Sequence, residues 1–143
     1  MKKCFPQFLL CFVGLLLLPS CTRTIVIQIF NATSGALEVV SYEKSGAERH
    51  YQIGPNQSGR VQVSRQLTVR RERVSWNYDL KPIPKTTNFF ASVALGPLVV
   101  KLQVEGDGTL YVLPPAATNV MRGFPPQPDG YPIRPKQGNY FPK

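Results

Sequence analysis

The side chains of this sequence that are capable of acid–base or nucleophilic chemistry form no known catalytic pattern. His50 is the only histidine among the 143 residues. A serine–histidine–aspartate relay or a histidine-ligated zinc would depend on it, yet no Gly-x-Ser-x-Gly turn accompanies it. No spacing among the carboxylates favours a pair for general acid–base catalysis. We therefore expect no enzyme, no metal and no cofactor. The carboxylates are Glu38, Glu43, Glu48, Glu72, Asp79, Glu105, Asp107 and Asp129.

The densest charged feature is a group of arginines, Arg70, Arg71 and Arg73, followed by Trp76 and Tyr78. Arginine forks bind phosphate or carboxylate, so these arginines are candidates for an anion-binding or partner-binding face. The same charges would also suit a solvated edge strand, where they prevent edge-to-edge pairing. We favour the edge-strand interpretation and keep the binding face as the alternative. The two aromatic residues alternate with apolar neighbours, which makes them core candidates.

The C-terminal segment, residues 114–143, holds eight of the 14 prolines and almost no large aliphatic side chains. Such a composition favours extended polyproline II and cannot fill a core. We expect this tail to be separable from the fold at little cost in stability. It is either a spacer or a recognition peptide, because preformed polyproline II loses little entropy on binding. As a recognition peptide it would use the aromatic anchors Phe124, Tyr131, Tyr140 and Phe141.

The first 20 residues have the layout of an export signal. Lys2 and Lys3 give a positive start, and an uncharged apolar run extends from Phe8 to Leu18. This run has 11 residues, fewer than the ~20 that a membrane-spanning helix needs. It matches the apolar core of a signal peptide, which is about 7–15 residues long. We expect residues 1–20 to be removed during export.

The residues Leu18, Pro19, Ser20 and Cys21 resemble the lipobox of bacterial lipoproteins, in which a leucine and two small residues precede a cysteine. Pro19 is an unusual occupant of its position. The resemblance implies a diacylglycerol on Cys21, cleavage before it and acylation of the new amine. Two or more acyl chains anchor a protein firmly. Thr22 stands where an inner-membrane retention signal would have aspartate, so the resemblance implies the periplasmic face of the outer membrane. The alternative is an unlipidated secreted protein with a stray thiol.

Cysteine use and charge set further limits. Cys4 and Cys11 lie in the signal and Cys21 would carry lipid, so no thiol remains for a disulfide or a metal site. Loss of Lys2 and Lys3 takes the 17 basic residues to 15, against 8 acidic ones, which gives a net charge of +7. Inside a cell this balance would suggest nucleic acid, but export excludes that partner. The polyanions outside the inner membrane are anionic lipid, lipopolysaccharide, peptidoglycan and acidic proteins.

Short segments rich in β-branched and aromatic residues alternate with turn signals, and none has a helical period. Between Val69 and Val74 the apolar side chains change from odd to even positions, which requires a turn or a bulge. We expect an all-β fold, an antiparallel β-sandwich or small barrel of about eight short strands. The expected strands are 24–30, 37–42, 49–53, 60–64, 67–80 with the switch inside it, 88–95, 98–105 and 109–113.

The chain thus divides into residues 1–20 (signal peptide), 21–23 (lipidated N-terminus), 24–113 (sandwich domain) and 114–143 (basic, proline-rich and aromatic tail). The expected function is a non-enzymatic interaction protein, an accessory component of a cell-envelope assembly such as a secretion machine. Lipoproteins of secretion machines with compact β-sandwiches are similar in plan, although their local motifs are not found in this chain. The alternative is an inhibitor or immunity lipoprotein that blocks a wall-degrading enzyme or a toxin.

Overall fold

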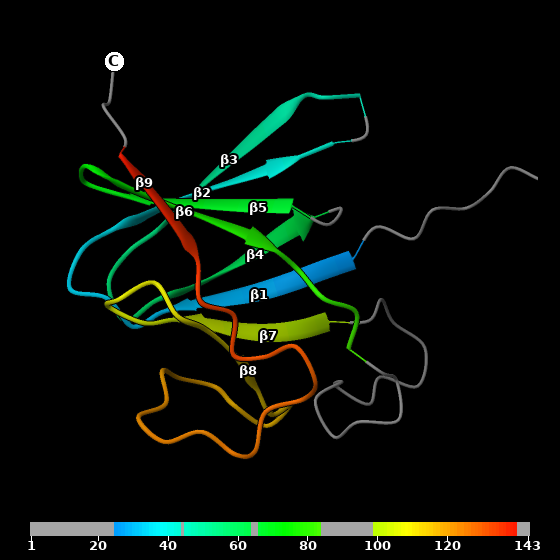
Figure 1. The fold of residues 1–143 in the computed structure, drawn as a ribbon. Helices are drawn as coiled ribbons and strands as arrows, with labels where there is room; N and C mark the ends of the chain where they lie inside the picture. The colour runs from blue at the N-terminus through cyan, green and yellow to red at the C-terminus, as the bar shows by residue number, and fades with distance from the viewer. Residues whose placement is uncertain (1–24, 44, 64–65, 84–98, 140–143) are drawn as a thin grey trace, which may run out of the picture.

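The computed structural model describes residues 25–43, 45–63, 66–83 and 99–139. These residues form strands and turns, with two β-sheets facing each other (Figure 1). The all-β class and the sandwich are therefore confirmed. The described part of the chain contains no helix long and apolar enough to span a bilayer. The strands are β1 (Ile25–Asn31), β2 (Leu37–Tyr42), β3 (Glu48–Ile53), β4 (Ser58–Val63), β5 (Gln66–Arg71), β6 (Val74–Asp79), β7 (Val99–Val104), β8 (Leu110–Leu113) and β9 (Lys136–Asn139).

The two sheets differ in size, and the four-stranded sheet contains one unexpected parallel pair. The four-stranded sheet has the order β4-β1-β7-β8, and the five-stranded sheet has the order β3-β2-β5-β6-β9. Neighbouring strands are antiparallel except β1 and β7, in which Val26 pairs with Val99 and both strands run the same way. This pair departs from the expected antiparallel arrangement. It arises because the chain passes through the five-stranded sheet before β7 returns beside β1.

The strand registers define two ends of the sandwich. β1 begins at Ile25, opposite Val63 at the end of β4, and β5 begins at Gln66, opposite Asp79 at the end of β6. Because two residues alone separate Val63 from Gln66, both sheets share this end, which we call the proximal end. β2 also finishes there, at Tyr42. The opposite end, with the β1–β2, β3–β4, β5–β6 and β7–β8 connections, is the distal end.

The core lies between the two sheets and consists of branched aliphatic side chains with Trp76 and Tyr78. Side chains alternate between the faces of a strand, and β4 shows this, with Val61 and Val63 buried and Gln62 exposed. Each fully buried aliphatic side chain contributes about 1.5–3 kcal/mol. The interpretation of Trp76 and Tyr78 as core residues is confirmed, since each is 3% exposed.

The predicted parity switch is a hairpin turn. β5 ends at Arg71, β6 begins at Val74, and these two residues pair. Glu72 between them has a φ of 53°, in the left-handed region that tight hairpin turns use. As a result Val69 lies opposite Trp76, and both face the core. The turn therefore restores one apolar face across two strands whose sequences are out of phase.

Three of the expected strands lie in residues 88–113. The prediction of a strand over 88–95 lies outside the described residues. The prediction over 98–105 corresponds to β7, and that over 109–113 corresponds to β8. The strand β9 was not predicted, because its sequence of lysine, glutamine, glycine and asparagine has no β-branched or aromatic residue.

Residues 114–139 lie against the sandwich, which corrects the expectation of a tail that is separable from the fold. Leu110 and Ile133 exchange two backbone hydrogen bonds of 2.9 Å, and β9 pairs with β6. The Gln127 side chain bonds both the N–H and the C=O of Val112. Proline cannot donate a backbone hydrogen bond, but the residues between the prolines supply the missing donors and acceptors. This segment covers the edge of β8 and completes the five-stranded sheet.

A second, smaller apolar cluster joins this segment to the sandwich. Its centre is formed by Phe30, Leu113 and Ala117. Phe124 packs against the cluster and stacks on Tyr111, with ring centroids 3.8 Å apart and planes 4° from parallel. Aromatic pairs of this kind add about 0.5–1.5 kcal/mol beyond their buried area. The segment is thus held by side chains as well as by backbone hydrogen bonds.

One buried side chain, that of Asn31, connects the loops at the distal end. Asn31 Nδ2 donates to the carbonyl oxygens of Gly35, Ile53 and Gly54 at 2.8–3.0 Å. Its Oδ1 accepts from the Thr33 N–H at 2.8 Å and from the Thr33 hydroxyl at 2.7 Å. Asn31 is fully buried, and it joins the β1–β2 connection to the β3–β4 connection. Burying an amide is favourable only when its bonding capacity is used in this way.

Candidate functional site

The candidate lipid-attachment residue, Cys21, lies outside the described residues. β1 begins at Ile25, at the proximal end, so residues 22–24 alone connect the cysteine to the sandwich. A chain extends by at most ~3.6 Å per residue, so the Cα atoms of Cys21 and Ile25 lie within about 14 Å of each other. A lipid on Cys21 would therefore hold the proximal end at the membrane surface.

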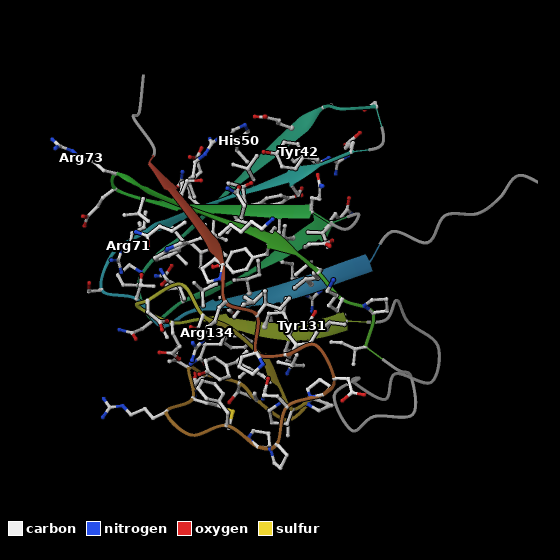
Figure 2. The ribbon with its side chains drawn as sticks, in the orientation of Figure 1. Tyr42, His50, Arg71, Arg73, Tyr131 and Arg134 are labelled. Carbon is white, nitrogen blue, oxygen red and sulfur yellow. The ribbon has the colours of Figure 1, made fainter. Side chains whose placement is uncertain are left out.

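The arginines predicted as one binding face do not share a face. Arg70 and Arg71 are consecutive in β5, so their side chains leave opposite sides of the sheet. Arg70 lies on the outer side, with Nη1 3.4 Å from Glu38 Oε2. Arg73 is exposed in the β5–β6 turn and points away from the molecule (Figure 2). The edge-strand interpretation is also wrong, because β5 lies between β2 and β6.

Arg71 supports the distal end of the fold. Its guanidinium lies 5.3 Å from the ring centroid of Trp76, and its Nη1 donates to the Gly106 carbonyl at 3.4 Å. Gly108 approaches the same indole so closely that a Cβ there would lie 2.6 Å from it. The Tyr78 hydroxyl donates to the Gly108 carbonyl at 2.6 Å. These contacts hold the β7–β8 turn in place. The Arg71 guanidinium therefore packs within the protein, against Trp76 and the turn.

The outer side of the five-stranded sheet carries a network of polar contacts around His50. The His50 Nδ1 lies 2.8 Å from Glu38 Oε1, and its Nε2 lies 3.2 Å from Glu48 Oε2. The hydrogen bond from His50, with a smaller contribution from Arg70, lowers the pKa of Glu38 despite its partial burial. Such a network orders side chains across three strands. Exposed pairs of this type are worth about 0–1 kcal/mol each.

A partly open hollow of about 610 Å³ lies at the proximal end of this sheet. Small-molecule sites have volumes of about 300–1,000 Å³, so the hollow is large enough for a small polar ligand. Its walls come from the adjacent ends of β2, β5 and β6 and from the segment that leads into β9. The lining residues are Tyr42, Gln66, Leu67, Thr68, Asn77, Tyr78, Asp79, Lys81, Ile133, Arg134 and Lys136.

Hydroxyl and amide groups form one wall of the hollow. Thr68 and Asn77 pair across β5 and β6, and the Thr68 hydroxyl donates to Asn77 Oδ1 at 2.8 Å. The Tyr42 hydroxyl lies 3.4 Å from the same threonine oxygen. Asn77 Oδ1 accepts from Thr68, and the Asn77 Nδ2 group has no hydrogen-bond partner among the described residues, so it can donate to a ligand or to water. This wall can orient a hydroxyl-bearing or anionic ligand.

Cations outnumber carboxylates in the hollow. Lys81 lies 3.5 Å from Asp79, and both side chains are about half exposed. Lys136, opposite Asn77 in β9, is exposed and forms no ion pair within the described part of the chain. Arg134 also lines the hollow. Ammonium groups form charge-assisted hydrogen bonds with phosphate and carboxylate oxygens, so the arrangement is chemically suited to a compact anion.

Of the four predicted tail anchors, Phe124 and Tyr131 are half-buried, and Tyr140 and Phe141 lie outside the described residues. Phe124 belongs to the aromatic stack, and Tyr131 packs against the main core. Burial raises the pKa of Tyr131 to about 12. Its hydroxyl donates to the Lys81 carbonyl at 3.1 Å, which fixes the backbone of a lysine that lines the hollow. Both anchors thus contribute to the fold.

Sequence reasoning missed the hollow because its residues are far apart in the chain. Tyr42, Lys81 and Lys136 meet only through the strand order β2-β5-β6-β9. The available signal was the polar residues Thr68 and Asn77, which alternate with apolar residues along their strands. Alternation places each on an outward face, but it does not reveal that the two residues are neighbours.

The described residues contain no group of three or more histidine, cysteine, aspartate or glutamate side chains that could hold a metal ion. Comparisons with protein-family models, with curated proteins and with solved structures return no match for this chain. The functional interpretation therefore rests on the residues and their geometry.

Proposed function

We propose that this chain is a lipid-anchored protein of the bacterial cell envelope that acts by binding, as a non-enzymatic accessory component of an envelope assembly. The lipobox-like residues Leu18, Ser20 and Cys21 support the anchor. The observation that carries the proposal is the short link between anchor and fold: β1 begins at Ile25, four positions after Cys21. A sandwich joined so closely to a lipid would remain at the membrane surface, on the periplasmic face of the outer membrane.

Anchoring at the proximal end would direct the distal end away from the membrane, where a protein partner can reach it. The exposed cation of the β5–β6 turn, Arg73, lies at this end. Arginine is enriched at the centres of protein interfaces and pairs with carboxylates through two hydrogen bonds. The proposed partner is therefore an envelope protein with an acidic surface.

Lipid labelling in cells tests the anchor. Cys21→Ser should abolish incorporation of an alkyne fatty acid, because the acceptor thiol is removed. The double variant Cys4→Ser/Cys11→Ser is the matched control and should be labelled like the unaltered protein. In density gradients the labelled protein should sediment with the outer membrane. Equal labelling of the Cys21→Ser variant would contradict the anchor, and sedimentation with the inner membrane would contradict the location.

Crosslinking in intact cells tests the binding role. The unaltered protein should recover the same envelope protein repeatedly, and Arg73→Ser should reduce that recovery severalfold. Arg60→Ser removes another exposed arginine, from β4, and should leave recovery unchanged. If both variants recover the same amount of partner, Arg73 is not part of the interface. If no partner is recovered reproducibly, the binding role itself is contradicted.

A further inference from the structure

The proximal hollow lies on the side of the domain that a lipid on Cys21 would bring to the membrane. Tyr42, Gln66 and Asp79 line the hollow, and each stands at the proximal limit of its strand. Ile25 begins β1 at the same end. The link of residues 22–24 is too short to turn the sandwich far from the bilayer, since it spans about 14 Å at most.

The charge of the hollow is opposite to that of lipid headgroups. Lys81 and Lys136 face one carboxylate, Asp79, among the lining residues. Arg134 also lines the hollow, but its positive charge contributes to the lowered pKa of Asp107 in the distal β7–β8 turn. Anionic membrane surfaces attract clusters of basic residues within about one Debye length, which is ~8–10 Å at ordinary salt. A hollow at the membrane-facing end therefore meets phosphate groups at high local concentration.

We propose that the proximal hollow binds the phosphate group of a membrane lipid headgroup, so that the domain docks on the bilayer through the end of its five-stranded sheet. The proposal rests on the proposed function, because the lipid anchor sets the orientation. Lys81 and Lys136 donate to the phosphate oxygens. Asn77, held by Thr68 at 2.8 Å, donates to a neighbouring hydroxyl of the glycerol or sugar that carries the phosphate.

Tyr131 has a positioning role in this site. Its hydroxyl binds the Lys81 carbonyl, and its ring packs against the core, so the lysine backbone is fixed to the sandwich. β9 places Lys136 beside Asn77 through the register of the sheet. The two ammonium groups are thus carried by separate elements that converge on one hollow, which distinguishes the site from a diffuse basic surface.

The test uses the mature chain, residues 21–143, with Cys21→Ser, so that no acyl chain contributes to membrane binding. The nine strands of the described residues all begin at or after Ile25, so these strands are retained. Co-sedimentation is measured with vesicles of phosphatidylcholine alone, with added phosphatidylglycerol, and with added lipopolysaccharide. The protein should bind one or both anionic vesicles and leave phosphatidylcholine unbound, because the choline cation of that lipid neutralises its phosphate. The preferred vesicle identifies a phospholipid or a phosphorylated sugar as the source.

The double variant Lys81→Ser/Lys136→Ser should weaken binding about 10- to 30-fold, the contribution expected of two lysines at an anionic surface. Arg60→Ser/Arg122→Ser changes the net charge equally, and both residues are exposed outside the hollow, so this control should bind as before. Circular dichroism checks that each variant is folded. Equal weakening by both pairs, or no vesicle binding at all, would overturn the proposal. Neither result depends on whether Cys21 is lipidated.

Discussion

The two ends of the sandwich use the same kinds of polar side chain in different ways. At the distal end Asn31 is fully buried, and its amide forms five hydrogen bonds within the protein. At the proximal end Asn77 is exposed, and its oxygen accepts a hydrogen bond from Thr68. An amide whose bonding capacity is used internally stabilises the fold, and one that keeps its donors can bind a ligand.

The aromatic residues show the same contrast. Trp76 and Tyr78 of β6 are buried against the β7–β8 turn, where Gly108 allows the close approach. Tyr42, at the proximal end of β2, is half-buried and presents its hydroxyl at the wall of the hollow. Buried polar and aromatic packing is therefore concentrated at the distal end, and the polar groups that line the hollow lie at the proximal end.

The largest expected effect comes from exchanging the two asparagines for alanine. Asn31→Ala leaves several buried carbonyl and N–H groups without partners, each costing about 1–3 kcal/mol, so we expect a loss of about 3–5 kcal/mol in the free energy of unfolding. Asn77→Ala, on the exposed face, should change it by about 0.5 kcal/mol or less. Urea unfolding measures both. If Asn77→Ala lowers the free energy of unfolding as much as Asn31→Ala does, the proposed difference between the two ends is contradicted.

Substitutions at two glycines, Gly46 and Gly108, form a matched pair that tests the packing at the distal end. Gly46 and Gly108 have positive φ angles of 83° and 82°. A Cβ at Gly46 meets nothing within 4 Å, whereas one at Gly108 would lie 2.6 Å from Trp76. Gly46→Ala should cost about 1–2 kcal/mol for the backbone alone. Gly108→Ala should cost about 1–3 kcal/mol more for overpacking. Equal free energies of unfolding for the two variants would show that the Trp76 side chain can move away from the added Cβ at little cost.

A smaller effect is expected at alkaline pH. Burial raises the pKa of Tyr131 from 10.0 to about 12, and burial also raises that of Tyr78. The folded state favours the neutral phenol, so stability is complete below pH 10 and decreases as the pH rises toward about 12. Phenylalanine does not ionise, so the Tyr131→Phe variant should lose less stability than the unaltered protein as the pH rises. The measurement is the melting temperature across the alkaline range. If the melting temperatures of the variant and the unaltered protein fall in parallel with rising pH, ionisation of Tyr131 does not contribute to the loss of stability.

The sequence predicted local structure well, because local structure depends on neighbouring residues. Alternation indicated the strands, and the parity change between Val69 and Val74 indicated the turn. The packing of residues 114–139 was not predictable in this way. Gln127 replaces a strand partner for Val112 with a side-chain amide, and Ile133 pairs with Leu110 from 23 positions away. No local pattern of proline-rich sequence signals such long-range bonds.

The candidate site was predictable only in its charge. Composition indicated a basic surface, but the sequence placed it at Arg70, Arg71 and Arg73. The structure assigns Arg70 to an ion pair with Glu38 and Arg71 to a stack on Trp76. Consecutive residues of a strand cannot form one face, so the arginine group was divided by strand geometry. The hollow instead draws its cations from segments whose proximity depends on strand order.

The orientation of the sandwich on the membrane is the central claim, and two alanines allow a direct measurement. Ala36 and Ala47 are exposed; Ala36 lies in the distal β1–β2 connection and Ala47 in the proximal β2–β3 turn. The variants Ala36→Cys and Ala47→Cys of the lipidated protein are labelled with a fluorophore in vesicles that contain headgroup-attached quenchers. We predict strong quenching of the label at position 47 and weak quenching at position 36. Equal quenching, or stronger quenching at position 36, would contradict the account.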